Sequence, residues 1–594
     1  MRARTILACF ALAVSTTITA AATAVAHGKH GKHGHHGHHR SGFTTAQPSM
    51  LNPVMPGVGV TPLLTVGDVL RSGFRYEAIP DGISLRTRGK GRVDLFVNHE
   101  TGKVPFPYNP VAPTAANGEN DFDNSQVSRL RLSQHSAGVL GGSFAIDSSS
   151  GYQRFCSNYL ATKKEGFSRD ILFTNEETPD YVFRQEESWP PPMGDPAEKE
   201  AGLVVALDVK NGKHHPIQGM GRHNHENSVP IPGYGKPVVL SGDDTFTSGP
   251  LLGVASTPNV TAESQLYSYI ASSTKSLLAD KGDLWAFVSD TPGVKNYYDV
   301  IPGSGMSVTG HFIKVPKDIA TGLNPDGSEL KAADKGYPAP PSNGSWQTDL
   351  RSATPVGIDG PQWVLQHWSD LHDVFQFVRV EDIAYDKRPG MSNVVYIADS
   401  GRGRTTAQSQ DTPNFRSSNG RVWKMVLDRR DPTKVTSLTV FVEGDDSPVK
   451  TPTEIHQPDN LESTRNGVLV TEDPGSSQQF PVGSPDPSAT TARLWQVPLT
   501  NPASAQVVAS VNQSADGGPT EFDGRPPGNQ GAWETTGIVD ASRAFGRDMF
   551  LINIQAHTLW IEKAPGDDNN GDGQPDFTYK REGGQLLLIK IPGG

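Results

Sequence analysis

Short apolar runs recur along the chain, and most of them are followed directly by acidic, amide or histidine residues. Two examples are 95–100, Leu-Phe-Val-Asn-His-Glu, and 171–177, Ile-Leu-Phe-Thr-Asn-Glu-Glu. Clusters of Gly, Pro, Asn and Asp separate the runs, and long stretches of helical periodicity are scarce. Short apolar runs bounded by turn-forming residues are typical of β-strands. The pattern therefore predicts an all-β protein from about residue 60 onwards.

The same motif, a strand with a polar end, occurs six times. The other four copies lie at 238–244, 394–399, 468–473 and 549–557. Further strands follow most copies, as at 282–288, 420–427 and 492–499. Repeated units of this kind are typical of propeller blades. We therefore expect a six-bladed β-propeller that extends over residues 46–594.

One interval between the copies is wide, from Asp244 to Asp399. It contains Pro-rich and Gly-rich pieces at about 300–376, with a helix expected at 318–321 or 369–375. We interpret this region as a long insertion on one blade.

A single polar strand end is an ordinary turn, but six of them predict carboxylates that converge near a central channel. Carboxylates held close together repel one another unless cations compensate their charge. Carboxylate oxygens are the ligands that calcium prefers. The sequence therefore predicts a centre that contains metal ions.

The first 26 residues have the layout of a cleaved signal peptide. Arg2 and Arg4 are followed by an apolar stretch from Ile6 to Val14 and by small residues that end at Ala26. That order predicts export and cleavage after Ala26, and the apolar stretch is too short to span a bilayer. We therefore expect a secreted protein without a membrane anchor.

The charge balance and the cysteine count restrict the class of protein further. After removal of residues 1–26, 51 Lys and Arg face 64 Asp and Glu, a net charge of −13. A charge of this sign argues against nucleic acid as a partner. Cys156 is the one cysteine left, so no internal disulfide is possible. We expect it to be a small buried apolar residue and the protein to be a monomer.

A histidine-rich segment, 27–45, follows the predicted cleavage site. Seven of the 18 histidines lie between His27 and His39. Such a tract cannot bury a core, so we expect disorder. Loose capture of zinc, copper or nickel and a solvated spacer are both open interpretations.

Eight short stretches together resemble the PhoX-type alkaline phosphatases. They occur in the order found in that family, at 97–100, 174–177, 221–226, 241–244, 379–382, 457–461, 533–537 and 553–557. The resemblance implies a six-bladed propeller that hydrolyses phosphate monoesters outside the cell. It also implies a site that holds calcium together with iron.

The resemblance also assigns roles to residues of this chain. Arg379 is implied to bind the substrate phosphate and, with Glu381, to be catalytic. The implied metal ligands are Glu176, Glu226, Asp243, Glu381, Asp459 and Glu534. In an extended strand, residues two apart face the same side. Arg379 and Glu381 are then both expected to face the channel, with Val380 turned away.

The chain departs from the family at one position. The family has an iron-binding cysteine just before its paired glutamates, and this chain has Asn175 there. A neutral amide does not replace a thiolate as a ligand for iron. The departure leaves the iron open and keeps an all-calcium site as an alternative.

A second calcium site is predicted near the C-terminus. Oxygen ligands at positions 1, 3, 5 and 9 and a Gly at position 6 match a calcium-binding loop. The predicted loop residues are Asp568, Asn570, Asp572, Gln574 and Asp576. Tyr579 stands at position 12, where such loops have Glu, so a plain polar hairpin is the alternative.

Three functions are compatible with these features. The first is a secreted, metal-dependent phosphatase that acts on a small phosphate ester. The second is another propeller hydrolase such as a lactonase, for which the stretch 458–460 is equally suitable. The third is a calcium-binding propeller without catalytic activity, which Asn175 favours.

Overall fold

The structure is a computed structural model, and the part described here is one compact unit, Arg40–Gly594. The residues it describes are 42–102, 124–178, 181, 199–245, 262–301, 303–342, 346–347, 356–401, 419–444, 453–474, 490–513, 532–565 and 577–594. The predicted signal peptide and the predicted calcium loop 568–576 lie outside these residues. Residues 27–41 of the histidine-rich segment also lie outside them, whereas 42–45 are described.

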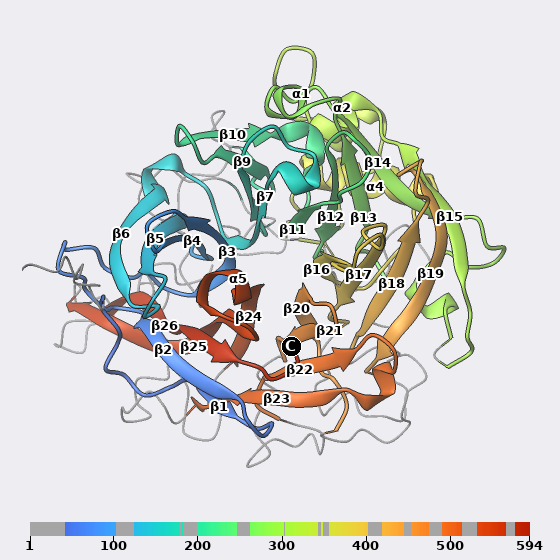
Figure 1. The fold of residues 1–594 in the computed structure, drawn as a ribbon. Helices are drawn as coiled ribbons and strands as arrows, with labels where there is room; N and C mark the ends of the chain where they lie inside the picture. Colours follow the sequence, from blue (N-terminus) through green and yellow to red (C-terminus); the bar gives the residue numbers. More distant parts are fainter. Residues whose placement is uncertain are drawn as a thin grey trace, which may run out of the picture. The chain divides into compact units, whose positions relative to one another are not determined.

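The unit consists mostly of antiparallel strands in five sheets arranged about a common centre (Figure 1). The first sheet contains β3 (Pro80–Arg88), β4 (Arg92–His99), β5 (Gln126–Ser133) and β6 (Val139–Ile146). The second contains β7 (Phe155–Ala161), β8 (Ile171–Glu176), β9 (Val204–Asp208) and β10 (Lys213–Ile217).

The third sheet has nine strands, and its two halves pair along β15 and β19. One half contains β11 (His225–Pro230), β12 (Val238–Asp243), β13 (Leu266–Ile270), β14 (Asp283–Ser289) and β15 (Val308–Lys314). The other half contains β16 (Val380–Tyr385), β17 (Val394–Asp399), β18 (Arg421–Leu427) and β19 (Lys434–Glu443).

The last two sheets each take a strand from the N-terminal end of the described chain. The fourth sheet contains β20 (Pro458–Ser463), β21 (Gly467–Glu472), β22 (Arg493–Pro498), β23 (Gln506–Val511) and β1 (Leu51–Pro53). The fifth contains β24 (Ala532–Asp540), β25 (Met549–Pro565), β26 (Phe577–Lys590) and β2 (Gly59–Thr65).

Helices are short in the described residues, and the longest has 11 residues. They are α1 (Thr274–Leu278), α2 (Lys317–Thr321), α3 (Ala332–Lys335), α4 (Pro361–Leu371) and α5 (Ser542–Phe545). Pro361 at the first position of α4 fits the helix start, because the missing N–H has no partner there in any case. The predicted insertion 300–376 contains β15, α2, α3 and α4, and its status as an insertion stays a prediction.

Apolar clusters between neighbouring sheets form most of the core. Phe96 and Val127 of the first sheet pack with Leu172 and Val205 of the second. The second strands, such as β12 and β17, are buried along their whole length because they are covered on both faces. Strands buried in this way have continuous apolar sequences, which explains the apolar runs of the sequence.

Six strands surround the centre of the unit. In order around it, β3, β7, β11, β16, β20 and β24 each contact the next, and β24 contacts β3 (Figure 1). The predicted all-β fold with a propeller-like arrangement of sheets is therefore confirmed. The number of six blades stays a prediction, because the strands as paired form five sheets.

Candidate metal centre

One side chain near the start of each central strand belongs to a set that we call the central ring. It contains the second residue of β3, β7, β11, β16 and β20 and the third residue of β24. These residues are Asp81, Cys156, Glu226, Glu381, Asp459 and Glu534. All six side chains are buried. Five carboxyl groups and one thiol are thus placed at the same end of six adjacent strands.

A β-bulge lies at the ring residue in five of the six central strands. The register of pairing shifts between Pro80 and Ile83 in β3, between Phe155 and Asn158 in β7, and at the matching places in β11, β16 and β20. In β24 the shift follows Glu534 and lies between Thr535 and Ile538. A bulge breaks the alternation of side chains and redirects one of them. It therefore explains how consecutive residues such as Glu381 and Asp382 are both buried near the centre.

Three groups of these side chains are tight enough to hold a metal ion. They are Asp81 with Glu100 and Cys156, Cys156 with Glu177 and Glu226, and Glu226 with Glu381 and Asp459. In each group the possible ligand atoms lie within 4.8 Å of one another. The groups share Cys156 and Glu226, so they form one connected cluster.

A second set of acids follows directly after four of the second strands. We call Glu100, Glu177, Asp244 and Asp473 the outer acids. Glu100 and Glu177 belong to the groups just described. Asp244 instead accepts two hydrogen bonds from Arg379, from Nε to Oδ1 at 2.8 Å and from NH2 to Oδ2 at 2.7 Å.

Three cationic side chains among the described residues contact acids of the central ring or the outer acids. Arg154 contacts Glu100 at 2.6 Å, and His557 Nε2 lies 2.9 Å from Glu534 Oε1. Arg379 NH2 lies 3.1 Å from Glu381 Oε1 in addition to its pair with Asp244. The central ring and the outer acids together offer nine carboxyl groups, so among the described residues these three cations compensate a minority of the possible negative charge.

Burial raises the pKa values of the carboxyl groups here, because a charged carboxylate loses its hydration. Burial and the neighbouring Glu100 raise the pKa of Asp81 to about 7. Burial and repulsion between carboxylates also raise the pKa values of Glu226 and Asp459. The pKa of Glu381 is raised by burial although Arg379 acts against the shift. The cluster therefore requires protons or cations, and its oxygen ligands fit hard divalent ions.

Backbone strain accompanies the centre. Ile79, Arg154 and Gln457 directly precede three of the central strands and have φ angles of 32°, 43° and 47°. Positive φ is costly for residues with a side chain, above all for the β-branched Ile79. Strain of this kind persists where the surrounding structure enforces it, commonly at functional sites.

Arg379 and Glu381 lie as their spacing predicts. Both side chains point to the same group of acids, while the intervening Val380 is buried in an apolar cluster with Phe377 and Val395. Ser400 donates a hydrogen bond to Glu381 Oε1. The pair is therefore not a solvent-exposed salt bridge.

Three of the predicted metal ligands lie outside the three groups: Glu534, which pairs with His557, and also Glu176 and Asp243. Glu176, the last residue of β8, accepts hydrogen bonds from the backbone N–H groups of Gln153 (2.8 Å) and Leu203 (3.1 Å). Asp243 accepts from Thr245 Oγ1 at 2.7 Å. Their neighbours Glu177 and Asp244 are the acids that reach the centre, because each comes one residue later, after the strand has ended.

The adjacent glutamates allow a direct comparison. Glu177→Gln is expected to lower the metal content of the purified protein with little change in the apo-protein's Tm. Glu176→Gln is expected to keep the metal, but to lower the free energy of unfolding by about 1–3 kcal/mol, because an amide N–H then faces a backbone N–H. Metal analysis and thermal unfolding of both variants measure this. Loss of metal from Glu176→Gln alone would reverse the assignment.

The surroundings of Cys156 differ from the prediction, which was a small buried apolar residue. The residue is buried, but its thiol donates to Asp81 Oδ2 at 2.6 Å and belongs to two of the three groups. The hairpin between β7 and β8 is responsible, since it pairs Phe155 with Glu176 and so returns the chain to the centre. Asn175 donates instead to the backbone carbonyl groups of Ser157 and Glu226.

Hydrogen bonds beneath the central ring connect three of its strands. Ser157 Oγ donates to Glu226 Oε1 at 2.7 Å and accepts from Asn460 Nδ2 at 2.8 Å. All three side chains are buried. This layer fixes the orientation of the Glu226 carboxylate, as supporting residues do in metal sites. The sequence analysis did not identify it, because neither Ser157 nor Asn460 is charged.

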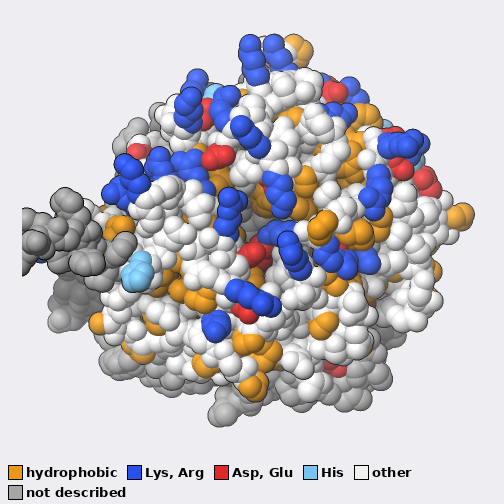
Figure 2. All heavy atoms as spheres, in the orientation of Figure 1, with side chains coloured by type: hydrophobic (Ala, Val, Ile, Leu, Met, Phe, Trp, Pro, Cys, Tyr) orange, Lys and Arg blue, Asp and Glu red, His pale blue; other side chains and the backbone are white. Residues whose placement is uncertain are grey.

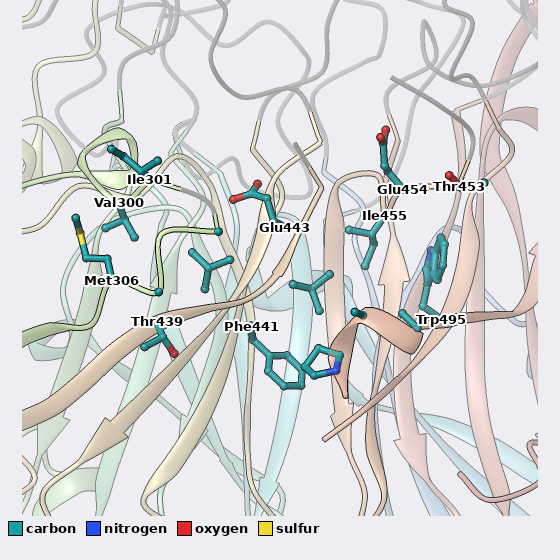
Figure 3. A pocket seen from close by; sticks show the side chains of 17 residues that line it. Val300, Ile301, Met306, Thr439, Phe441, Glu443, Thr453, Glu454, Ile455 and Trp495 are labelled. Atoms are coloured by element: carbon teal, nitrogen blue, oxygen red, sulfur yellow. The ribbon is translucent and has the colours of Figure 1, made fainter. Parts of the chain in front are cut away.

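A separate pocket of about 530 Å³ lies between β19 and the turn that precedes β23 (Figure 3). Its lining is mainly apolar and includes Val300, Met306, Phe441, Ile455 and Trp495. None of its lining residues belongs to the central ring or to the outer acids. It is therefore not part of the candidate centre.

Comparisons with known proteins give one family. The model of the family "Alkaline phosphatase PhoX" matches residues 192–497. No curated protein matches the sequence. In the described part of the chain, no helix is long and apolar enough to cross a membrane.

Solved structures give more distant likenesses. A sialidase from Trypanosoma rangeli has 9% identity and a TM-score of 0.33, with 91% of this chain and 60% of the sialidase covered. The chain thus spans about three fifths of that protein. The NanB sialidase from Streptococcus pneumoniae has 9% identity and a TM-score of 0.28, with 86% and 68% covered. At such TM-scores the likenesses carry no information about the activity of this chain.

Proposed function

Because the chain belongs to the PhoX family of alkaline phosphatases, we propose that it is a metal-dependent hydrolase of phosphate monoesters. The observation that carries this proposal is the position of Arg379 beside the acid cluster. Its guanidinium is held by Asp244 through two hydrogen bonds and lies 3.1 Å from Glu381. A planar guanidinium matches the geometry of a phosphate group.

The donor set divides into two kinds of metal site. Glu226, Glu381 and Asp459 supply oxygen alone, which fits calcium. The two groups that contain Cys156 add a sulfur ligand, which fits a transition metal such as iron. Bound ions of this kind supply the positive charge that the oxygens of a phosphate ester require. Cys156 thus offers the thiolate that Asn175 cannot.

In the proposed reaction the residues of the chain bind and orient the ester. Arg379 binds phosphate oxygens, and Asp244 fixes the plane of the guanidinium. Glu381 would be one of the ligands of a bound metal ion. The layer of Ser157 and Asn460 keeps the Glu226 carboxylate in place.

Two finer features belong to the same proposal. We count six blades, since six central strands contact one another in a closed order and the nine-stranded sheet divides between β15 and β19. We also propose that the protein is secreted and acts as a monomer on a small substrate. The signal-peptide layout of residues 1–26 and the family support the secretion.

Hydrolysis assays test the proposed function. The metal-replete protein is expected to hydrolyse a chromogenic phosphate monoester and not a lactone. Chelation is expected to abolish this activity and to lower the Tm, because metal that binds the native state alone stabilises it by about 2.7 kcal/mol at a hundredfold excess over Kd. A metal-replete protein that cleaves the lactone and leaves the ester intact would disprove the proposal.

A further inference from the structure

The turns at the far end of the sheets form a surface remote from the central ring. Every central strand starts at the ring, so the turns that join first to second strands and third to fourth strands lie at the opposite end. We call this set the turn face. It comprises 89–91, 134–138, 162–170, 209–212, 231–237, 271–282, 386–393, 428–433, 464–466, 499–505 and 541–548.

The turn face is strongly basic in an acidic protein. Its segments contain fifteen Lys and Arg against seven Asp and Glu, whereas the whole chain has a net charge of −11. The basic residues come from all five sheets, and Lys90, Lys210 and Arg465 are exposed examples from three of them. The central strands therefore run from an acidic ring at one end to basic turns at the other.

Figure 2 shows the face on which α5 lies. Lys and Arg side chains are spread across it around a central hollow in which acidic side chains are visible (Figure 2). On the turn face, burial and the neighbouring Lys387 lower the pKa of Lys164. Lys387 also contacts Glu462, and the remaining positive charge of the turn face attracts anions.

Arginines beside the turn face add to its positive charge. Arg86, Arg88 and Arg129 all contact one buried carboxylate, that of Asp94, at 3.4, 3.2 and 2.7 Å. Arg86 also contacts Asp170 at 2.8 Å. Three arginines around two aspartates leave a local excess of one positive charge.

The distribution of the charge indicates the shape of the partner. The basic residues stand on the tips of turns across the whole face, so they can touch a broad surface together. A linear polyanion would contact one row of them at a time. We therefore propose that the turn face docks on the surface of an anionic lipid bilayer, held by electrostatic attraction to lipid phosphate groups.

Docking in this way also orients the candidate metal centre. The central ring lies at the other end of the six central strands, so it is on the side away from the bilayer. The inference does not depend on the proposed activity, since it uses none of the residues of the centre.

Sedimentation with vesicles tests the docking. The full protein is expected to bind vesicles of phosphatidylcholine with 30% phosphatidylglycerol and not vesicles of phosphatidylcholine alone. Binding is expected to disappear as salt is raised from 50 to 500 mM, because exposed charges are screened. Each Lys or Arg near an anionic surface contributes about a fivefold change in partitioning.

Two matched triple variants distinguish the effect of the turn face on binding from the effect of the protein's net charge. Lys90→Glu, Lys210→Glu and Arg465→Glu together are expected to weaken vesicle binding about a hundredfold or more. Arg71→Glu, Lys199→Glu and Lys295→Glu change the net charge equally, but all three residues lie outside the turn face, so binding is expected to fall far less. Lysine and arginine to glutamine versions replace any triple that fails to fold.

Three outcomes would overturn the proposal. They are no binding to the anionic vesicles at 50 mM salt, an equal loss in both triple variants, and displacement of the protein from vesicles by an equal charge of single-stranded DNA.

Discussion

A lysine in place of Arg379 is expected to lower kcat/KM for a phosphate monoester by a hundredfold or more, which is about 2.7 kcal/mol of transition-state stabilisation. Lysine keeps the charge but not the planar fork that contacts Asp244 through Nε and NH2. The metal content is expected to stay unchanged, since Arg379 offers no ligand atom. Steady-state kinetics and metal analysis of the same preparation measure both quantities.

Arg388 provides a matched control. It forms the same kind of pair with Asp386, from Nε and NH2 to the two carboxylate oxygens, in the turn that follows β16. Arg388→Lys changes the same chemical group far from the central ring and is expected to leave kcat/KM within about twofold. If Arg379→Lys hydrolyses the ester as fast as the parent protein, Arg379 does not bind the phosphate.

Replacement of Cys156 by serine is expected to have the second largest effect, because two of the three candidate metal groups contain this residue. A serine hydroxyl does not replace a thiolate for a softer metal ion. We expect loss of bound transition metal, retention of calcium, and a fall in kcat of a hundredfold or more. Elemental analysis and the visible absorption of a metal–thiolate bond are the measurements.

The double variant Cys156→Ser with Asn175→Cys distinguishes the two positions at which a cysteine could act. Asn175 holds the backbone carbonyl groups of Ser157 and Glu226, so a thiol at its position is not expected to restore metal or activity. Full restoration would mean that position 175 faces the metal, as the resemblance alone had implied.

The fold class could be predicted from sequence because the second strands carry a clear signal. All six apolar runs with polar ends are second strands, namely β4, β8, β12, β17, β21 and β25. Sheets cover them on both faces, so their sequences are almost purely apolar and easy to recognise. The same runs do not reveal how sheets pair at their outer edges, which is where β15 and β19 meet.

The central strands carry no such signal. β11 reads His-Glu-Asn-Ser-Val-Pro and β20 reads Pro-Asp-Asn-Leu-Glu-Ser, yet both are fully buried. Their surroundings are polar, and a bulge interrupts their alternation, so neither hydrophobicity nor period two identifies them. Glu226, Glu381, Asp459 and Glu534 were found through the family resemblance, whereas Asp81 was missed.

The outer acids show a different limit. In Glu176-Glu177 and Asp243-Asp244 the first acid of the pair lies in the strand and the second lies beyond it. The sequence analysis noted both pairs but gave the first member of each, Glu176 and Asp243, as the metal ligand. The deciding fact is where the strand ends, and strand ends are the least predictable feature of a sequence. A rule that favours the second acid of such a pair would have selected Glu177 and Asp244.

The closed arrangement of strands limits when, during synthesis of the chain, the central ring can form. Asp81 lies on the first central strand and Glu534 on the last, and β2 from the beginning of the described chain pairs with β26 near its end. A ribosome must therefore release almost the whole polypeptide before the central ring can exist. If the chain crosses the membrane unfolded, the metals available where it folds, not where it is synthesised, decide which ions it contains.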